Sequence, residues 1–169
     1  MSSPPTAIDP ETLERLRRGV PLRMSATGAL LFDEGPITHP RVRQALREGL
    51  DTSDTGEVIV RLGAQWCYLT VEDCPLRATA VRVAGSTLHM RLDDGREVPL
   101  RLWTLWDEPG AGLRAQAPSR HSGRALSVRF TNRAQMDLAD RLEEGEGDHT
   151  VLVLDEARLP IARTSPDGA

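Results

Sequence analysis

The arginines are the residues with the most evident chemical potential, because they supply all 21 basic side chains of the sequence. A guanidinium group pairs bidentately with a carboxylate or a phosphate, so grouped arginines are typical of sites for small anions. Compositional bias is the simpler explanation, since the chain carries 25 acidic side chains that can serve as surface partners. The net charge of −4 and the lack of a basic stripe argue against nucleic-acid binding.

The densest group of cationic and hydroxyl side chains is the segment Arg120-His121-Ser122-Gly123-Arg124. Two guanidinium groups on such a loop could hold a phosphate, and glycine permits close approach of the backbone. An ordinary surface loop explains the same composition, and no helix N-terminus is evident nearby.

An aromatic segment combines Arg101 with Trp103 and Trp106. On one regular strand, residues three apart point to opposite faces, so one tryptophan could be buried and the other exposed. An exposed tryptophan beside Arg101 could stack on a base or a cation. Packing of both rings in the core or at a subunit contact is the alternative.

The two cysteines, Cys67 and Cys74, match neither a CxxC redox motif nor a zinc-binding pair. Cys67 lies in an apolar strand pattern and is expected to fill space in the core. Cys74 precedes Pro75 in a turn, where we expect it to be accessible and to be the better candidate for redox chemistry.

Motifs of established catalytic chemistry do not occur in the sequence. There is no GxSxG elbow, HExxH pair, P-loop or dinucleotide-binding glycine run. The histidines are isolated from one another, which predicts no metal site and no cofactor; they are His39, His89, His121 and His149. The sequence therefore favours a non-enzymatic protein.

The pattern of elements predicts an α+β fold with a mostly antiparallel sheet. Residues 1–21 read as a disordered tail at 2–6 and a short helix from Pro10, which Asp9 caps and Gly19 ends. A hairpin over 22–25 and 29–32 follows, and then a helix over 40–50. Five strands are expected next, at 58–62, 66–71, 77–83, 87–92 and 97–106, with an Asp94-Gly95 hairpin turn.

The last third repeats this alternation. After a short strand at 113–116, we expect a strand at 125–131, a helix at 132–143, and a hairpin of strands 150–154 and 158–161. Asn132 would cap the helix with Gln135 in a capping box, and its buried face would comprise Met136, Ala139 and Leu142.

The order of elements in residues 22–71 resembles that in 113–161, which indicates a duplicated strand–helix–strand unit. We expect an N-terminal subdomain over 22–76, a β-rich C-terminal subdomain over 77–163 and a disordered tail over 164–169.

Neither a signal peptide nor an apolar run near the roughly 20 residues of a membrane span is present. The sequence thus predicts a cytoplasmic protein that does not contact membranes and whose cysteines are reduced.

Three segments resemble the bacterial domain-of-unknown-function family 1285. The run from Thr27 to His39 is similar to the family's aromatic strand and GSPIGR-like turn, and the positions in register are Gly28, Phe32, Pro36 and Ile37. Residues 69–76 are similar to its IxVxDxPF motif, through Asp73 and Pro75, and Val128-Arg129 with the following helix to its C-terminal part. The sequence departs from the family at His39, where arginine is usual, and at residues 62–65.

The resemblance implies a two-part α+β fold whose C-terminal half is superficially similar to pleckstrin-homology folds. It also implies a nucleotide-like ligand between the halves and a role in signalling. We therefore expect a sensory or regulatory domain that binds a small anionic ligand. The candidate ligand-binding residues are His39, Arg61 and Arg129, then Arg101 and Trp103, then Arg120 and Arg124, and the family turns contribute Gly28, Gly35, Pro36, Asp73 and Pro75.

Two other functions remain open. A protein–protein adaptor would use a strand edge or the Trp103/Trp106 surface. A thiol-dependent redox sensor would use Cys74.

Overall fold

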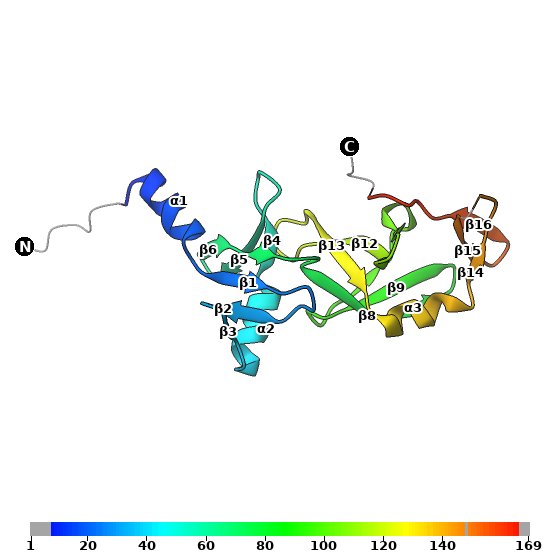
Figure 1. Cartoon of the computed structure of the whole chain (residues 1–169), viewed down its shortest axis with the longest axis horizontal. Coiled ribbons are helices and arrows are strands. Elements are labelled where there is room, and N and C mark those ends of the chain that lie inside the picture. The colour runs from blue at the N-terminus through cyan, green and yellow to red at the C-terminus, as the bar shows by residue number, and fades with distance from the viewer. Residues whose placement is uncertain (1–7, 148, 166–169) are drawn as a thin grey trace, which may run out of the picture.

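The computed structural model describes residues 8–147 and 149–165 and shows an elongated molecule, with α1 at one end and the β14–β16 strands at the other (Figure 1). Its helices are α1 (Pro10–Arg18), α2 (Pro40–Glu48) and α3 (Asn132–Ala139). The remaining elements are short strands, paired mostly antiparallel. The predicted α+β class is confirmed. The tail predicted over 2–6, and all but the first two residues of the tail predicted over 164–169, lie outside the described residues.

The N-terminal half, residues 22–75, contains two small sheets beside α2. The strand order is β3-β2-β1-β7 in one and β4-β5-β6 in the other, and β1 and β7 run parallel. The strands are β1 (Leu22–Met24), β2 (Leu30–Phe32), β3 (Gly35–Pro36), β4 (Leu50–Thr52), β5 (Val58–Leu62), β6 (Gln65–Tyr68) and β7 (Thr70–Val71).

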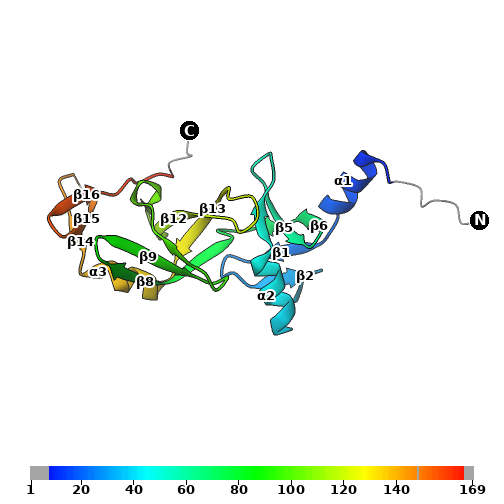
Figure 2. The same ribbon diagram turned by 180° about the vertical axis from the view of Figure 1, so that it is seen from behind.

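The C-terminal half, residues 76–161, is dominated by a six-stranded sheet, visible from behind in Figure 2. Its strand order is β10-β9-β8-β13-β12-β11. Within the described part of this sheet, β8 and β13 are the only neighbours that run parallel. A separate three-stranded sheet, β14-β15-β16, ends the half. The elements are β8 (Leu76–Ala84), β9 (Thr87–Leu92), β10 (Glu97–Pro99), the 3-10 helix η1 (Leu102–Thr104), β11 (Trp106–Glu108), β12 (Gly112–Pro118), β13 (Ala125–Phe130), β14 (Leu142–Glu144), β15 (Thr150–Leu154) and β16 (Ala157–Pro160).

Local signals explain several of these boundaries. The Asp9 carboxylate accepts a hydrogen bond from the backbone N–H of Thr12 (2.9 Å), and α1 starts at Pro10 and ends before Gly19, as predicted. The hairpin expected at Asp94-Gly95 is confirmed, because Gly95 takes a positive φ of 88° and joins β9 to β10.

Alternation along β12 and β13 places their apolar side chains in one contiguous core that spans both halves of the chain. Leu113, Ala115 and Ala117 of β12 point into it, as do Val128 and Phe130 of β13. The intervening residues of these strands therefore lie on the other face, where β12 and β13 carry arginines.

The helix expected over 132–143 ends at Ala139, and it buries a different face from the one expected. Thr131, rather than Asn132, is the N-cap, and its hydroxyl accepts a hydrogen bond from Ala134 N (3.3 Å). The buried side chains are Ala134 and Leu138, while Met136 is 72% exposed. The prediction chose the wrong apolar face because both sets of residues have helical spacing.

Three other predicted elements divide in the structure. The helix from Pro40 ends before Gly49, so Leu50 begins β4 instead of closing the helix. The strand expected over 66–71 is split into β6 and β7, and the strand over 97–106 is interrupted by η1. This interruption leaves Trp103 exposed at 75% and Trp106 buried at 6%, one of the two arrangements expected from their spacing.

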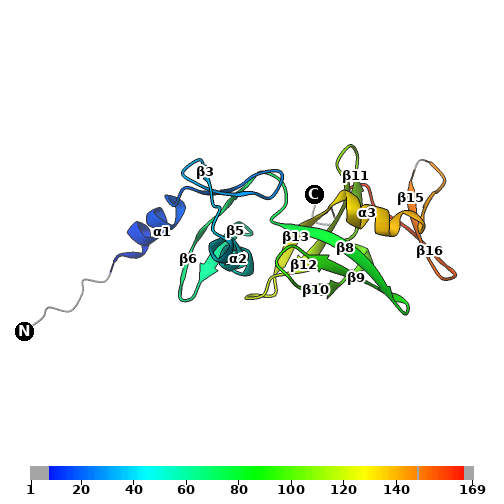
Figure 3. The ribbon, with the colours of Figure 1, turned by 90° about the horizontal axis from the view of Figure 1, so that it is seen from below.

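The order strand, strand, helix and three strands occurs in both halves. It comprises β1, β2, α2, β4, β5 and β6 in one, with β3 inserted, and β12, β13, α3, β14, β15 and β16 in the other. Seen from below, α2 lies among the N-terminal strands and α3 beside the six-stranded sheet (Figure 3). A duplication origin and the pleckstrin-homology similarity stay predictions, as does the boundary after residue 76, which falls at the start of β8.

Candidate functional site

Three arginines form a row across adjacent strands of the six-stranded sheet. Arg129 of β13 pairs with Arg77 of β8 on one side and with Arg114 of β12 on the other. Paired residues point to the same face of a sheet, and this face is opposite to the core residues of the same strands. The row faces the connection from β7 to β8, which belongs to the N-terminal half.

Asp73 in that connection binds two members of the row. Arg129 Nη1 donates to its Oδ2 (2.8 Å), and Arg114 Nη1 lies 2.6 Å from its Oδ1. Burial on its own would raise the pKa of the Asp73 carboxyl, but the hydrogen bonds from Arg129 and Arg114 outweigh it and lower that pKa. Asp73 therefore stays ionised and fixes the Arg129 side chain. Arg114 also forms an ion pair with Glu108.

Arg77 is different, because it is buried and its guanidinium group binds backbone carbonyls. Arg77 Nη2 donates to the oxygen of Ala26 (2.6 Å) and Nη1 to that of Cys74 (3.4 Å). Burial lowers the pKa of Arg77. Among the described residues no carboxylate forms an ion pair with this guanidinium, so the row carries more positive than negative charge.

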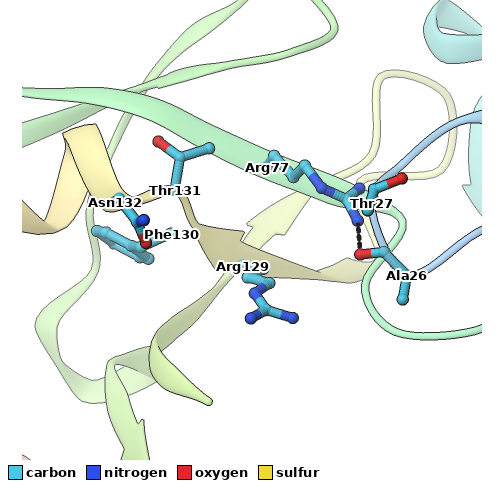
Figure 4. Close-up of a pocket in the computed structure, with 7 residues that line it drawn as sticks. All are labelled: Ala26, Thr27, Arg77, Arg129, Phe130, Thr131 and Asn132. Carbon is cyan, nitrogen blue, oxygen red and sulfur yellow. Dashed lines mark hydrogen bonds between the residues drawn. The ribbon is translucent and has the colours of Figure 1, made fainter.

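A cavity of about 280 Å³ opens beside Arg77 and Arg129, between the two halves (Figure 4). Residues of the turn between β1 and β2 line one side, and the first turn of α3 lines another. The partial positive charge at a helix N-terminus adds to the field of the arginines there. The lining residues are Ala26, Thr27, Arg77, Arg129, Phe130, Thr131 and Asn132.

Two arginines, Arg47 of α2 and Arg77 of β8, tie the β1–β2 turn to the C-terminal half. Arg47 Nη2 donates to the oxygen of Gly28 (2.7 Å), while Arg47 Nη1 donates to Asp93 Oδ2 (2.5 Å). Gly28 has a positive φ of 85° and lies in contact with the Arg77 guanidinium. Hydrogen bonds from Arg47 and Arg77 thus fix the turn whose residues Ala26 and Thr27 line the cavity.

The first-ranked residues of the sequence prediction do not converge on one site. Arg129 lines the cavity just described, whereas Arg61 on β5 lines another cavity and donates through Nε to Asp51 Oδ2 (2.6 Å). His39 is exposed at the N-cap position of α2. Of the family-turn residues, Gly28 and Asp73 take part in the site, Gly35 and Pro36 form β3, and Pro75 is buried.

The arginines of the 120–124 loop have protein partners. Arg120 Nη2 donates to the carbonyl of Asp94 (2.7 Å), and Arg124 Nη1 donates to the carbonyl of Thr52 (3.0 Å) and pairs with Asp54 through Nη2. These contacts tie the loop to its neighbours and give the two guanidinium groups structural roles. Arg101 lies 5.9 Å from the ring centre of the exposed Trp103.

The expectation that Cys74 is accessible is wrong, because it is only 1% exposed. Its Cys-Pro turn folds inward beneath Arg114, whose Nη1 lies 2.9 Å from the sulfur. Burial raises the pKa of the Cys74 thiol, and it also raises that of the half-buried Cys67.

Sequence reasoning missed Arg77 and Arg114 as site residues. Their positions follow from the register of β8, β12 and β13, and pairing between distant strands leaves no local signal in the sequence.

Over residues 8–147 and 149–165, no group of three histidine, cysteine or acidic side chains is placed to hold a metal ion. None of the helices in the same part of the chain has the length and apolar character needed to cross a bilayer.

Comparison with known proteins extends the sequence resemblance to the fold. No family profile matches the sequence, and no curated protein sequence matches it. The crystal structure of a DUF1285 family protein from Silicibacter pomeroyi DSS-3 is similar, with a TM-score of 0.64 and 16% identity, over 86% of this chain and 81% of that chain. A DUF1285 family protein from Shewanella baltica OS155 matches with a TM-score of 0.57 and 14% identity, over 72% of this chain and 92% of the other. The chain therefore has the fold of DUF1285 family proteins, as the resemblance in its sequence predicts.

Proposed function

We propose that this protein is a regulatory or sensory domain of the DUF1285 type that binds a small anion in the cavity between its halves. The observation that carries the proposal is the buried guanidinium of Arg77, which binds two backbone carbonyls and forms no ion pair with a carboxylate of the described residues. The ligand group would be a phosphate or a carboxylate, alone or as part of a nucleotide-like molecule.

The energetics of burial support an anionic ligand. A buried charge is costly unless it is paired, and carbonyl oxygens supply only part of the compensation. An anion in the cavity would gain charge-assisted hydrogen bonds from Arg77 and Arg129, and its charge would be favourable beside the N-terminus of α3. Asp73 contributes by holding Arg129 in place before the ligand arrives.

The location of the cavity supports a sensory role. A ligand there would contact Ala26 and Thr27 of the N-terminal half together with Arg77 and Arg129 of the C-terminal half. Binding energy would then depend on how the halves are oriented, which is the condition for a ligand to shift a conformational equilibrium.

A thermal-shift screen against nucleotides, cyclic dinucleotides and small anionic metabolites tests the proposal. A ligand that binds only the folded state stabilises it by about 2.7 kcal/mol at a hundred times its Kd. A saturable rise in melting temperature with one anionic class supports the proposal, and no rise with any compound of the panel contradicts it.

A second candidate function, a protein–protein adaptor, is favoured by the exposure of Trp103 beside Arg101. Exposed tryptophan and arginine are enriched in interface hot spots. Partner capture and assembly that are unchanged by Trp103→Ala would eliminate this surface as an interface.

A further inference from the structure

The outer face of the β4-β5-β6 sheet carries a second, chemically distinct cavity. The register of β5 and β6 places Arg61 opposite Trp66 and Ile59 opposite Tyr68, so these side chains share one face. They border a cavity of about 260 Å³ with residues of the loop after β4. The complete lining is Ser53, Asp54, Thr55, Ile59, Arg61, Trp66 and Tyr68.

A fixed pair of aromatic rings forms one wall of this cavity. Trp66 and Tyr68 meet edge to face, with ring centroids 5.3 Å apart and an interplanar angle of 70°. Helix α1 holds the rings, because Arg17 and Arg18 each stack at 3.9 Å over one of them. The Tyr68 hydroxyl group also donates a hydrogen bond to the Glu14 carboxylate (2.6 Å). The rings therefore offer a rigid apolar surface to a planar group.

The opposite wall presents an arginine that is already oriented. Asp51 is fully buried, and its Oδ2 accepts a hydrogen bond from Arg61 Nε (2.6 Å). Within the described part of the chain, neither Nη atom of Arg61 has a hydrogen-bond partner. A guanidinium anchored through Nε leaves two parallel N–H groups for a carboxylate or a phosphate. Asp54 on the rim is bound to Arg124, so the carboxylate that pairs with Arg61 is Asp51.

We propose that this cavity is a binding site for a planar aromatic ring that bears an anionic group, either a carboxylate or a phosphate. The ring packs against Trp66 and Tyr68, and the anionic group accepts hydrogen bonds from the Nη atoms of Arg61. The volume of about 260 Å³ lies just below the roughly 300–1,000 Å³ typical of sites for drug-sized ligands, which favours a ligand with a single ring system.

This site differs from the cavity beside Arg77 in what it recognises. Among the residues that the structure describes, the one aromatic side chain lining the first cavity is Phe130, which is 1% exposed. Inorganic phosphate suits the first site, whereas the second gains much of its affinity from ring contacts. The two proposals can therefore fail separately.

Nitrogen–proton NMR of the tryptophan indoles tests the second site directly. The chain contains three tryptophans, and the Trp66 indole signal is assigned as the one that Trp66→Phe removes. We expect benzoate and phenyl phosphate to shift this signal saturably and to leave that of Trp103 in place. Benzamide, the uncharged analogue of benzoate, should bind at least about tenfold more weakly, since it forms no charge-assisted pair with Arg61.

Variants distinguish this site from the first one. Arg61→Gln should weaken the benzoate-induced shift at least about tenfold, while Arg129→Gln should leave it unchanged. If Arg61→Gln does not fold, the comparison of benzoate with benzamide on the wild-type protein still tests whether the site requires an anionic group. A Trp66 signal that neither aromatic anion moves up to its solubility limit overturns the proposal, and so does an equal response to benzoate and benzamide. Inorganic phosphate alone should not move this signal.

Discussion

The guanidinium group of Arg77 lies directly against Gly28, so that a Cβ atom at position 28 would be 2.3 Å from Arg77 Nη1 and 2.6 Å from Cζ. The two residues belong to different halves of the chain, and Arg77 lines the inter-half cavity. The missing side chain at Gly28 lets the β1–β2 turn reach Arg77, which then donates to Ala26. This contact explains in physical terms why position 28, which is in register with the DUF1285-like segment, is occupied by glycine.

Gly28→Ala should be strongly destabilising. The backbone at Gly28 has φ of 85°, which is unfavourable for alanine, and the added methyl group would displace the Arg77 side chain. Gly56 has the same φ of 85°, but a Cβ added there would have no neighbour within 4 Å, so Gly56→Ala measures the backbone effect alone. We expect Gly28→Ala to cost about 1–3 kcal/mol more than Gly56→Ala in urea denaturation. Equal costs would show that Arg77 does not occupy this position.

Asp51→Asn should lower the free energy of unfolding by about 3 kcal/mol or more, because it breaks a buried charge pair. The carboxylate of Asp51 joins β4 to the C-terminal half, since it accepts hydrogen bonds from Ser119 (2.6 Å), Ser122 and Arg61. Asp54→Asn is the matched control, because its exposed ion pair with Arg124 should contribute at most about 1 kcal/mol. Similar losses for both variants in chemical denaturation would contradict the role of Asp51.

The contribution of Asp51 should depend on pH in a defined direction. Burial would raise its pKa, but the hydrogen bonds from Ser119, Ser122 and Arg61 outweigh burial and hold the pKa well below its usual value. A carboxyl with a lowered folded-state pKa stabilises the protein above its unfolded pKa of about 3.9 and loses that contribution as pH falls further. The stability difference between wild type and Asp51→Asn should thus be constant from neutral pH to about 5 and shrink below about 4. A difference that shrinks between pH 7 and 5 would contradict this.

Both thiols should react slowly in the native protein. Cys74 is buried, and burial raises the pKa of both cysteines, which lowers the fraction of reactive thiolate. With a chromogenic disulfide reagent at pH 8, we expect Cys67 to react before Cys74, as resolved with Cys67→Ser, and both to react at once in urea. Rapid native labelling of Cys74 would restore the redox-sensor hypothesis.

The elements with strong local signals could be predicted from the sequence. Asp9, Pro10 and Gly19 define α1, and Asp94-Gly95 defines the β9–β10 hairpin, because capping and turn chemistry act within a few residues. Strand β4 was missed because Leu50 continues the apolar spacing of α2. This error concealed Asp51, which sits at the centre of β4 and looks like an ordinary surface acid in the sequence.

The candidate sites were only partly predictable for a related reason. Arg129 and Arg61 were both identified, but their separation into two cavities depends on which strands are neighbours. The importance of Arg77 depends on the parallel pairing of β8 with β13 and on the approach of Gly28 from the other half. Long-range pairing of this kind is set by the packing of the whole chain and leaves no trace in residue spacing.

Isothermal titration with inorganic phosphate, on the wild type and two matched variants, tests the inter-half anion site most directly. The wild type should bind phosphate saturably, and Arg129→Gln should weaken binding at least about tenfold, because it removes a charge-assisted hydrogen bond. Arg124→Gln removes a guanidinium of the same charge that is bound elsewhere, to Thr52 and Asp54, and should leave the affinity unchanged. No binding to the wild type, or equal losses in both variants, would contradict the assignment of the cavity beside Arg77 and Arg129 as an anion site.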